Sequence, residues 1–157
     1  MPLLLVRHGH AGRRSAYQGD DWVRPLSKRG LAQAQTLVPL LSEYRPQRVL
    51  SSPFVRCFET VRPTAEALGI AVESIDELAE GHGPEALRLM ARMEGESAVL
   101  CTHGDVADEA LEALAGERSG KEKQSIRLQK GDVWVIQSTG SSLAIVTRIR
   151  PPRGTGG

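Results

Sequence analysis

The stretch Leu3-Leu4-Leu5-Val6-Arg7-His8-Gly9 joins a short apolar run to a histidine and a glycine. A second stretch, Ala98-Val99-Leu100-Cys101-Thr102-His103-Gly104, has the same form. Apolar runs of this length are typical of buried strands and are short for helices. In open α/β sheets, ligands bind just beyond the carboxyl ends of the strands. We therefore expect His8 and His103 to face one ligand, and the neighbouring Arg7 points to an anion.

Length and composition indicate a globular domain. The chain has 157 residues, of which 40% are hydrophobic and 25% are charged. Its net charge of +1 gives no global field that would recruit nucleic acid or an anionic membrane, so we predict neither as a partner. Cys57 and Cys101 form no disulfide framework and no metal-type pair. Because no apolar stretch reaches the length of a signal-peptide core or a membrane span, we expect a cytoplasmic protein.

The order of apolar and helical patterns predicts the fold class. Strand and helix patterns alternate along residues 1–150, which favours one α/β domain: a three-layer α/β/α sandwich with a mostly parallel central sheet. Residues 151–157, rich in Pro and Gly, are expected to form a disordered tail. Ser27 is predicted to cap one helix, and Ser52 another with Pro53 at its first position. Pro39 and Pro63 are expected to disturb these helices. Further expectations are strands at 48–51, 70–72, 132–137 and 143–149, helices at 85–93 and 105–114, and a mobile charged loop at 116–124.

Arg56 lies in a segment that is expected to begin a helix after a strand. A cation near a helix N-terminus is disfavoured by the helix dipole, so an arginine there makes better sense if an anion binds nearby. Its planar guanidinium can hold two phosphoryl oxygens at once. Arg7 and Arg56 should also oppose a second positive charge and so keep His8 neutral. From the residues alone, His8 could still be a nucleophile, a base or a metal ligand.

Four ordered blocks carry a resemblance to a known family. They are Val6-Arg7-His8-Gly9, the segment Arg24-Pro25-Leu26-Ser27-Lys28-Arg29-Gly30 with Gln33-Ala34, Ser51-Ser52-Pro53 with Arg56 and Thr60, and Thr102-His103-Gly104-Asp105. Together they resemble the histidine phosphatase superfamily, which includes cofactor-dependent phosphoglycerate mutases and short phosphohistidine phosphatases. The compact length and Gly19-Asp20-Asp21 are similar to the short bacterial branch and to phosphatase domains fused to Nudix hydrolases in actinobacteria.

The resemblance implies a phosphoglycerate mutase-like fold and a phosphatase that needs no metal or other cofactor. It implies that His8 becomes a phosphohistidine, and that the phosphoryl oxygens are bound by Arg7, Arg56 and His103, with Arg14 as a further phosphate contact. It places the general acid at Glu80, with Glu77 and Asp105 as alternatives. The implied substrates are phosphomonoesters or phosphoramidates, carried by a small molecule, a nucleotide or a phosphoprotein.

Two other functions remain open from the sequence. The first is a metal-dependent hydrolase, with a ligand set drawn from His8, His10, His103 and Asp105. The second is a module that binds phosphate without turnover. Arg13 has no assigned role, and His10 and His82 are not expected to act in catalysis. Trp22 and Trp134 are expected to be packing residues.

Overall fold

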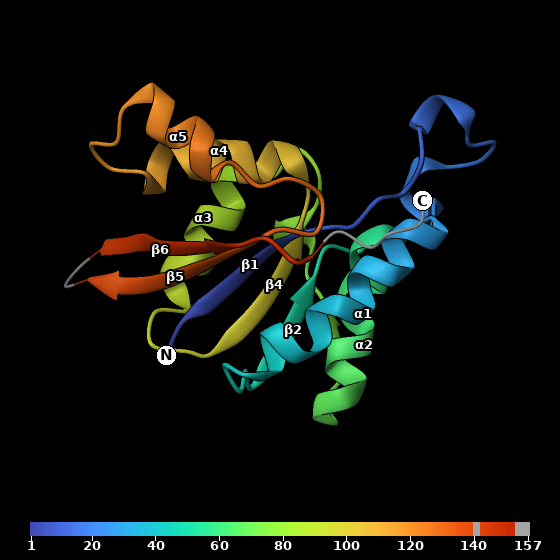
Figure 1. Cartoon of the computed structure of the whole chain (residues 1–157), viewed down its shortest axis with the longest axis horizontal. Helices are drawn as coiled ribbons and strands as arrows, with labels where there is room; N and C mark the ends of the chain where they lie inside the picture. Colours follow the sequence, from blue (N-terminus) through green and yellow to red (C-terminus); the bar gives the residue numbers. More distant parts are fainter. Residues whose placement is uncertain (140–141, 153–157) are drawn as a thin grey trace.

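The computed structural model describes residues 1–139 and 142–152, and its elements form three layers around one sheet (Figure 1). Within these residues the sheet has six strands in the order β3-β2-β4-β1-β5-β6. Their bounds are β1 Leu3–Arg7, β2 Arg48–Ser51, β3 Val72–Ser74, β4 Ala98–Thr102, β5 Val133–Thr139 and β6 Ser142–Ile149. Strands β3, β2, β4 and β1 pair in parallel. Strand β5 pairs antiparallel with both β1 and β6. The predicted mostly parallel α/β fold is confirmed.

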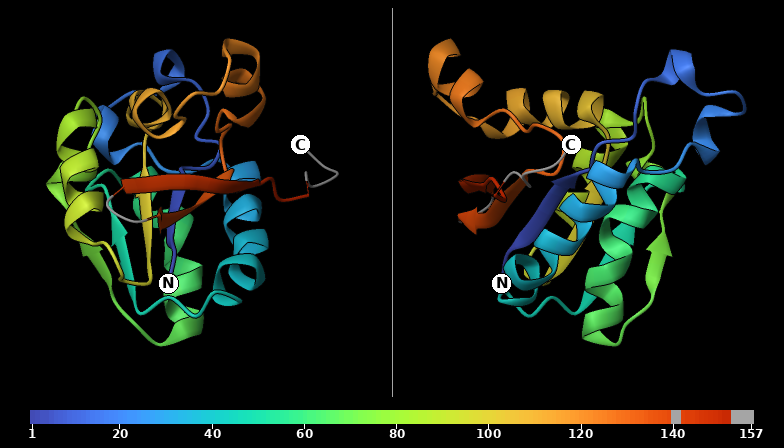
Figure 2. Two further views of the ribbon diagram at one scale, coloured as in Figure 1. Left: turned by 90° about the vertical axis from the view of Figure 1, so that its left-hand side faces the viewer. Right: turned by 45° about the vertical axis from the view of Figure 1, so that its right-hand side comes forward.

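Helices cover both faces of the sheet, as Figure 2 shows for α1 and α3. One face carries α1 (Lys28–Ser42) and α2 (Val55–Leu68), and the other carries α3 (Gly83–Arg92) and α4 (Gly104–Leu114), followed by α5 (Gly120–Ile126). Short 3-10 turns occupy η1 (Arg14–Ala16), η2 (Asp21–Val23) and η3 (Asp76–Leu78). None of the helices in the described ranges is long and apolar enough to cross a membrane.

Alternation along β1 builds the two halves of the core. Leu3 and Leu5 pack with α3 and α4, whereas Leu4 and Val6 pack with α1 and α2. This is the two-residue period of a strand that is buried on both faces. The same period places the Arg7 guanidinium against the first residue of α4, Gly104.

Both internal prolines are accommodated inside helices, contrary to the expected disturbance. Helix α1 continues past Pro39 to Ser42, and α2 continues past Pro63 to Leu68. In α1, Leu37 and Leu41 are fully buried on either side of the proline, so packing on the sheet offsets the lost backbone hydrogen bond.

Four further local expectations are wrong. Helix α2 begins at Val55 rather than at Pro53, because the Ser52 hydroxyl accepts from the Phe54 N–H and does not cap the helix itself. The charged segment 116–124 contains most of α5, which is capped where the Ser119 hydroxyl accepts from the Glu122 N–H. The third strand lies at 72–74 rather than at 70–72. Trp134 is buried as predicted, but Trp22 is 54% exposed.

Pro151 and Pro152 are described, and residues 153–157 of the expected tail lie outside the described residues.

Candidate active site

The two histidines that follow the apolar runs lie side by side at one edge of the sheet. Strands β1 and β4 pair in parallel with Arg7 opposite Thr102, so the next residue of each strand leaves the sheet at the same point. The backbone N–H of His8 donates to the Thr102 carbonyl at 3.0 Å. The ring centroids of His8 and His103 are 5.4 Å apart. The structure therefore brings together the two histidines that the sequence analysis paired.

The His8 ring is held in one orientation and in its neutral form. Its Nδ1 lies 2.8 Å from the Gly9 carbonyl, which can only accept, so Nδ1 carries the hydrogen and Nε2 keeps its lone pair. Burial, with further effects from His103, Arg56 and Arg7, lowers the pKa of His8 to about 3. The expected neutrality thus has a larger cause than the arginine charges, namely loss of solvent. A neutral imidazole with a free Nε2 is the form that can act as a nucleophile.

His103 is oriented by Ser52, the last residue before the turn into α2. The Ser52 hydroxyl lies 2.8 Å from His103 Nε2 and accepts from the Phe54 N–H at 3.2 Å. The other ring nitrogen of His103 is its Nδ1. That Nδ1 is buried and has no hydrogen-bond partner in the described part of the chain.

Arg56, the second residue of α2, is 1% exposed and lies beneath the loop that follows β1. Its Nη1 donates to the Asp21 carbonyl at 2.9 Å, and its Nη2 donates to the Asp21 carboxylate at 3.1 Å. The same Nη2 is 3.5 Å from Glu80 Oε1. The helix start and the acidic loop residues thus hold a buried guanidinium in a fixed position, with its Nε unpaired among the described residues.

Arg7 is fixed from the opposite side of the site. Its Nη1 donates to the Leu128 carbonyl at 2.9 Å, and its Nε is buried without a partner within residues 1–139 and 142–152. A Cβ at position 104 would lie 2.7–2.9 Å from the guanidinium, so only glycine allows this approach. Gly104 is therefore required by the position of Arg7 rather than by backbone freedom.

Three buried nitrogens without a partner among the described residues lie near the neutral His8. Buried N–H groups without an acceptor are costly, and nearly all such groups in proteins are satisfied. Arg7 Nε, Arg56 Nε and His103 Nδ1 are three of the six buried side-chain nitrogens and oxygens without a partner in the described ranges. A tetrahedral anion next to His8 would supply the missing acceptors.

Of the three candidate acids, Glu80 lies next to the arginines. Both of its oxygens accept from Arg14 Nη2, at 2.9 and 3.0 Å, which adds to its contact with Arg56. Glu77 instead accepts from Arg92 at 2.6 Å, on the side of α3. The Asp105 carboxylate accepts from the Gly81 N–H at 2.7 Å and so fixes the loop that carries Glu80.

The structure also shows site residues that the sequence analysis did not single out. Asp21 pairs with Arg14, Arg24 and Arg56, and so links the loop after β1 to α2. Thr60 accepts from the Gly9 N–H at 3.0 Å and donates to the Arg56 carbonyl at 2.7 Å. Thr60 occurs in one of the four quoted blocks and Asp21 in the segment Gly19-Asp20-Asp21. The pairing of Asp21 with Arg56, and of Thr60 with Gly9, spans more than 30 positions and has no local signal in the sequence.

The alternative metal-ligand set does not assemble. No group of three or more His, Cys, Asp or Glu residues that could hold a metal ion occurs in the described part of the chain. His10 Nδ1 lies 2.6 Å from the Ser27 hydroxyl, and Asp105 is engaged with Gly81. Within the described residues the Arg13 side chain forms no hydrogen bond or ion pair with the site, and its carbonyl accepts from the Ala16 N–H in the turn η1.

Comparisons with known proteins agree with this arrangement. The chain is 35% identical over 157 residues to the 8-oxo-(d)GTP phosphatase of Mycolicibacterium smegmatis, covering 96% of this chain and 48% of the relative. The chain therefore spans about half the length of this relative. It is also 26% identical to the transcription factor tau 55 kDa subunit of Saccharomyces cerevisiae, covering 85% of this chain and 33% of that protein.

Solved structures share the whole fold. A protein assigned as the phosphohistidine phosphatase SixA of Agrobacterium tumefaciens has a TM-score of 0.80 at 25% identity, covering 96% of this chain and 98% of that one. A SixA complex with tungstate has a TM-score of 0.76 at 21% identity, with coverages of 96% and 97%. The family model described as histidine phosphatase superfamily (branch 1) matches residues 3–87, more than half of the chain. This chain belongs to the histidine phosphatase superfamily.

Proposed function

We propose that this chain is a phosphatase that works through a covalent phosphohistidine at His8 and needs no metal ion. The observation that carries the proposal is the set of unpaired, buried donors around a neutral His8. Arg7, Arg56 and His103 each leave one nitrogen without a partner in the described residues, and the pKa of His8 is lowered to about 3. Positively charged donors that neutralise the phosphoryl oxygens can replace the electrostatic role of a metal.

The reaction has two displacements. His8 Nε2 attacks the phosphorus while the bond to the leaving oxygen breaks, and Glu80 supplies the proton to that oxygen. Water then attacks the phosphohistidine, Glu80 takes its proton, and inorganic phosphate leaves. Because Arg14 binds both Glu80 oxygens, one of these hydrogen bonds must open for each proton transfer. Arg14 is thus a positioning residue for the acid and a further phosphate contact.

We infer the substrate class from the group that the site would bind and from the substrates named for similar proteins. Phosphomonoesters and phosphoramidates both present a terminal phosphoryl group that the three donors fit. A relative of this chain is named for a nucleotide substrate and a structural neighbour for phosphohistidine. Phosphorylated small molecules, nucleotides and phosphoproteins are therefore the substrates to screen.

A trapping experiment tests the nucleophile. The protein, with and without EDTA, is incubated with p-nitrophenyl phosphate, and the phosphorylated residue is mapped by mass spectrometry. We expect turnover that persists in EDTA and an acid-labile phosphate on His8, absent in His8→Ala. His82→Gln, which changes a histidine outside the set of phosphate donors, should keep the label.

Other outcomes separate the alternatives. Activity that is lost in EDTA and restored by a divalent metal would support a metal-dependent hydrolase. Tungstate binding without turnover of any phosphomonoester would support a module that only binds phosphate. A label on a residue other than His8 would overturn the proposed mechanism.

A further inference from the structure

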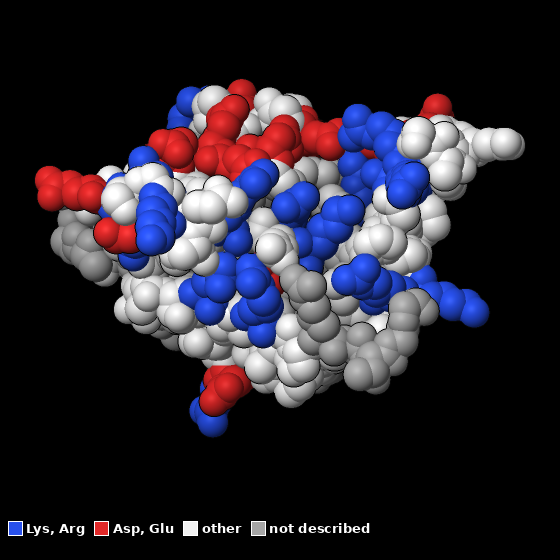
Figure 3. Space-filling model, turned by 45° about the horizontal axis from the view of Figure 1, so that its top comes forward, with Lys and Arg blue, Asp and Glu red and all other residues white. Residues whose placement is uncertain are grey.

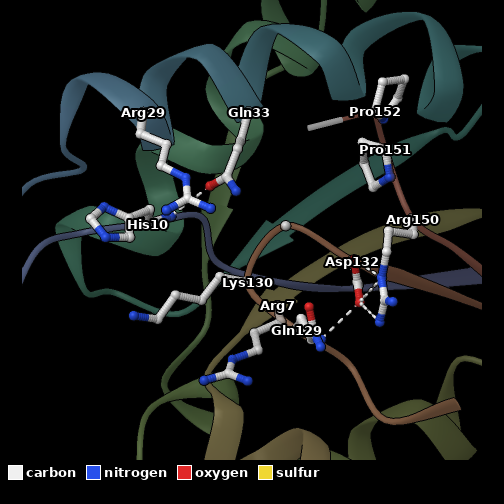
Figure 4. A pocket seen from close by; sticks show the side chains of 11 residues that line it. Arg7, His10, Arg29, Gln33, Gln129, Lys130, Asp132, Arg150, Pro151 and Pro152 are labelled. Atoms are coloured by element: carbon white, nitrogen blue, oxygen red, sulfur yellow. Dashed lines mark hydrogen bonds and ion pairs between the residues drawn. The ribbon is translucent and has the colours of Figure 1, made fainter. Parts of the chain in front are cut away.

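A cavity of about 370 Å³ lies along the segment that carries the proposed nucleophile (Figure 4). Its lining includes the residues before and after the His8-Gly9 pair, namely Arg7 and His10. Helix α1 contributes Arg29 and Gln33, and the remaining lining residues are Gln129, Lys130, Gly131, Asp132, Arg150, Pro151 and Pro152. None of the phosphate donors on α2 or after β4 lines it, so this cavity adjoins the phosphoryl site and is not the same space.

The turn that carries Lys130 is bonded to the backbone of the nucleophile. The Gly131 N–H donates to the Arg7 carbonyl at 2.9 Å and to the His8 carbonyl at 3.2 Å. The Arg7 N–H donates in return to the Asp132 carbonyl at 3.1 Å. Gly131 has a φ of 85°, a conformation that L side chains rarely adopt, so the sharp turn depends on glycine. Lys130, at the turn, is thereby tied to the backbone of the segment that carries His8.

The cavity carries positive charge that nothing in the described residues neutralises. Its one carboxylate, Asp132, is paired with Arg150 at 3.1 Å. Lys130 and Arg29 form no ion pair with a carboxylate in residues 1–139 and 142–152, and Lys130 and Arg7 extend in the same direction in Figure 4. Burial, Arg7 and further arginines lower the pKa of Lys130, and burial, Lys130 and Arg29 lower that of His10. Lys and Arg side chains surround the hollowed centre of this face (Figure 3).

A single phosphoryl group does not need these cations. The transferred group is already matched by Arg7, Arg56 and His103, whose unpaired donors surround His8. Lys130 and Arg29 are exposed to solvent, and a cleft lined by charges of one sign attracts anions. Because Gly131 of this turn bonds to the His8 carbonyl, a second anion at Lys130 would lie near the first.

We propose that Lys130 and Arg29 bind a second phosphate, joined to the transferred phosphoryl group by an anhydride bond, so that the substrate is a diphosphate such as a nucleoside diphosphate. The proposal rests on the proposed function. His8 Nε2 bonds to the terminal phosphorus as the bond from that phosphorus to the bridging oxygen breaks, and the electron pair stays on the bridging oxygen. A nucleoside monophosphate leaves, and water then releases inorganic phosphate from His8. Lys130 and Arg29 stabilise the charge that develops on the leaving phosphate.

The test compares two substrates that differ by one phosphate, ADP and AMP. We expect the wild-type protein to have a higher kcat/KM for ADP. In Lys130→Ala and in Arg29→Ala, the ratio of the kcat/KM values for ADP and AMP should fall about tenfold, which corresponds to about 1.4 kcal/mol of transition-state stabilisation. The matched control is Lys121→Ala, which removes a lysine in α5 that lines neither this cavity nor the phosphoryl site and should leave the ratio unchanged.

The outcomes distinguish this proposal from the proposed function. Equal losses for ADP and AMP, or no change in the ratio in either variant, would overturn the second phosphate site. Turnover of p-nitrophenyl phosphate without a preference for ADP would overturn it too, while the phosphohistidine mechanism would stand. A wild-type protein that turns over none of the three substrates would contradict the proposed function itself.

Discussion

The burial of His8 should make the stability of the protein depend on pH in a specific way. The pKa of His8 is about 3 in the folded protein, against about 6.5 in an unfolded chain. Below about pH 6.5, His8 therefore binds a proton in the unfolded chain but stays unprotonated in the folded protein. Acid thus favours unfolding. The stability is complete above that pH and falls by about 1.4 kcal/mol per pH unit until the pH approaches about 3. Between pH 7 and pH 5 the loss is about 2 kcal/mol.

A variant that cannot titrate isolates this effect from the other ionisable groups. The free energy of unfolding is measured by urea denaturation at pH 7 and pH 5 for the wild type and for His8→Gln. We expect the wild type to lose about 2 kcal/mol more than the variant over this range. Equal losses would show that His8 titrates normally in the folded state, and the argument that burial keeps it neutral would be wrong. The same reasoning predicts no ionisation of His8 near pH 6.5 in the profile of kcat/KM.

Three further predictions concern the site and the core. Glu80→Gln should lower kcat for an aryl phosphate by about 10²–10⁴-fold through loss of the general acid. Glu77→Gln, whose carboxylate faces α3, should change kcat less than about twofold. Equal effects would refute the assignment of Glu80 as the general acid. Gly104→Ala should displace the guanidinium of Arg7 and lower kcat/KM, with the far-ultraviolet circular dichroism unchanged; wild-type kinetics would contradict this. Trp134→Ala should cost about 3–5 kcal/mol in urea denaturation, since the side chain is fully buried; a loss below about 1 kcal/mol would refute its role in the core.

The central part of the fold and site could be predicted because its signals are local. Each apolar run ends at a histidine-glycine pair, and parallel strands deliver their carboxyl ends to one edge of the sheet. The register of Arg7 opposite Thr102 then needs no further information to place His8 beside His103. The unfavourable position of Arg56 at the start of α2 is also visible in the sequence, because the helix dipole makes it anomalous without an anion.

Contacts between distant segments could not be predicted from local patterns. The charged segment before β5 has the composition of a loop, yet α5 forms there because Lys123 pairs with Glu112 and the Trp134 indole donates to the Ile126 carbonyl. Trp22 was expected to pack, but its place in η2 leaves it exposed. Propensity and composition are weak guides where tertiary contacts decide the outcome.

The ion pairs of Arg56 with Asp21 and Glu80 limit how its guanidinium can bind a phosphoryl group. In this structure Arg56 Nη2 is shared by the carboxylates of Asp21 and Glu80, at 3.1 and 3.5 Å. A phosphoryl group that uses this guanidinium must compete with both carboxylates or bind to the unpaired Nε. Binding through Nε leaves the Asp21 contact intact, and with it the link between the loop after β1 and α2. In the proposed mechanism, the buried Nε is thus the donor through which Arg56 binds the phosphoryl group while Asp21 still binds Arg56.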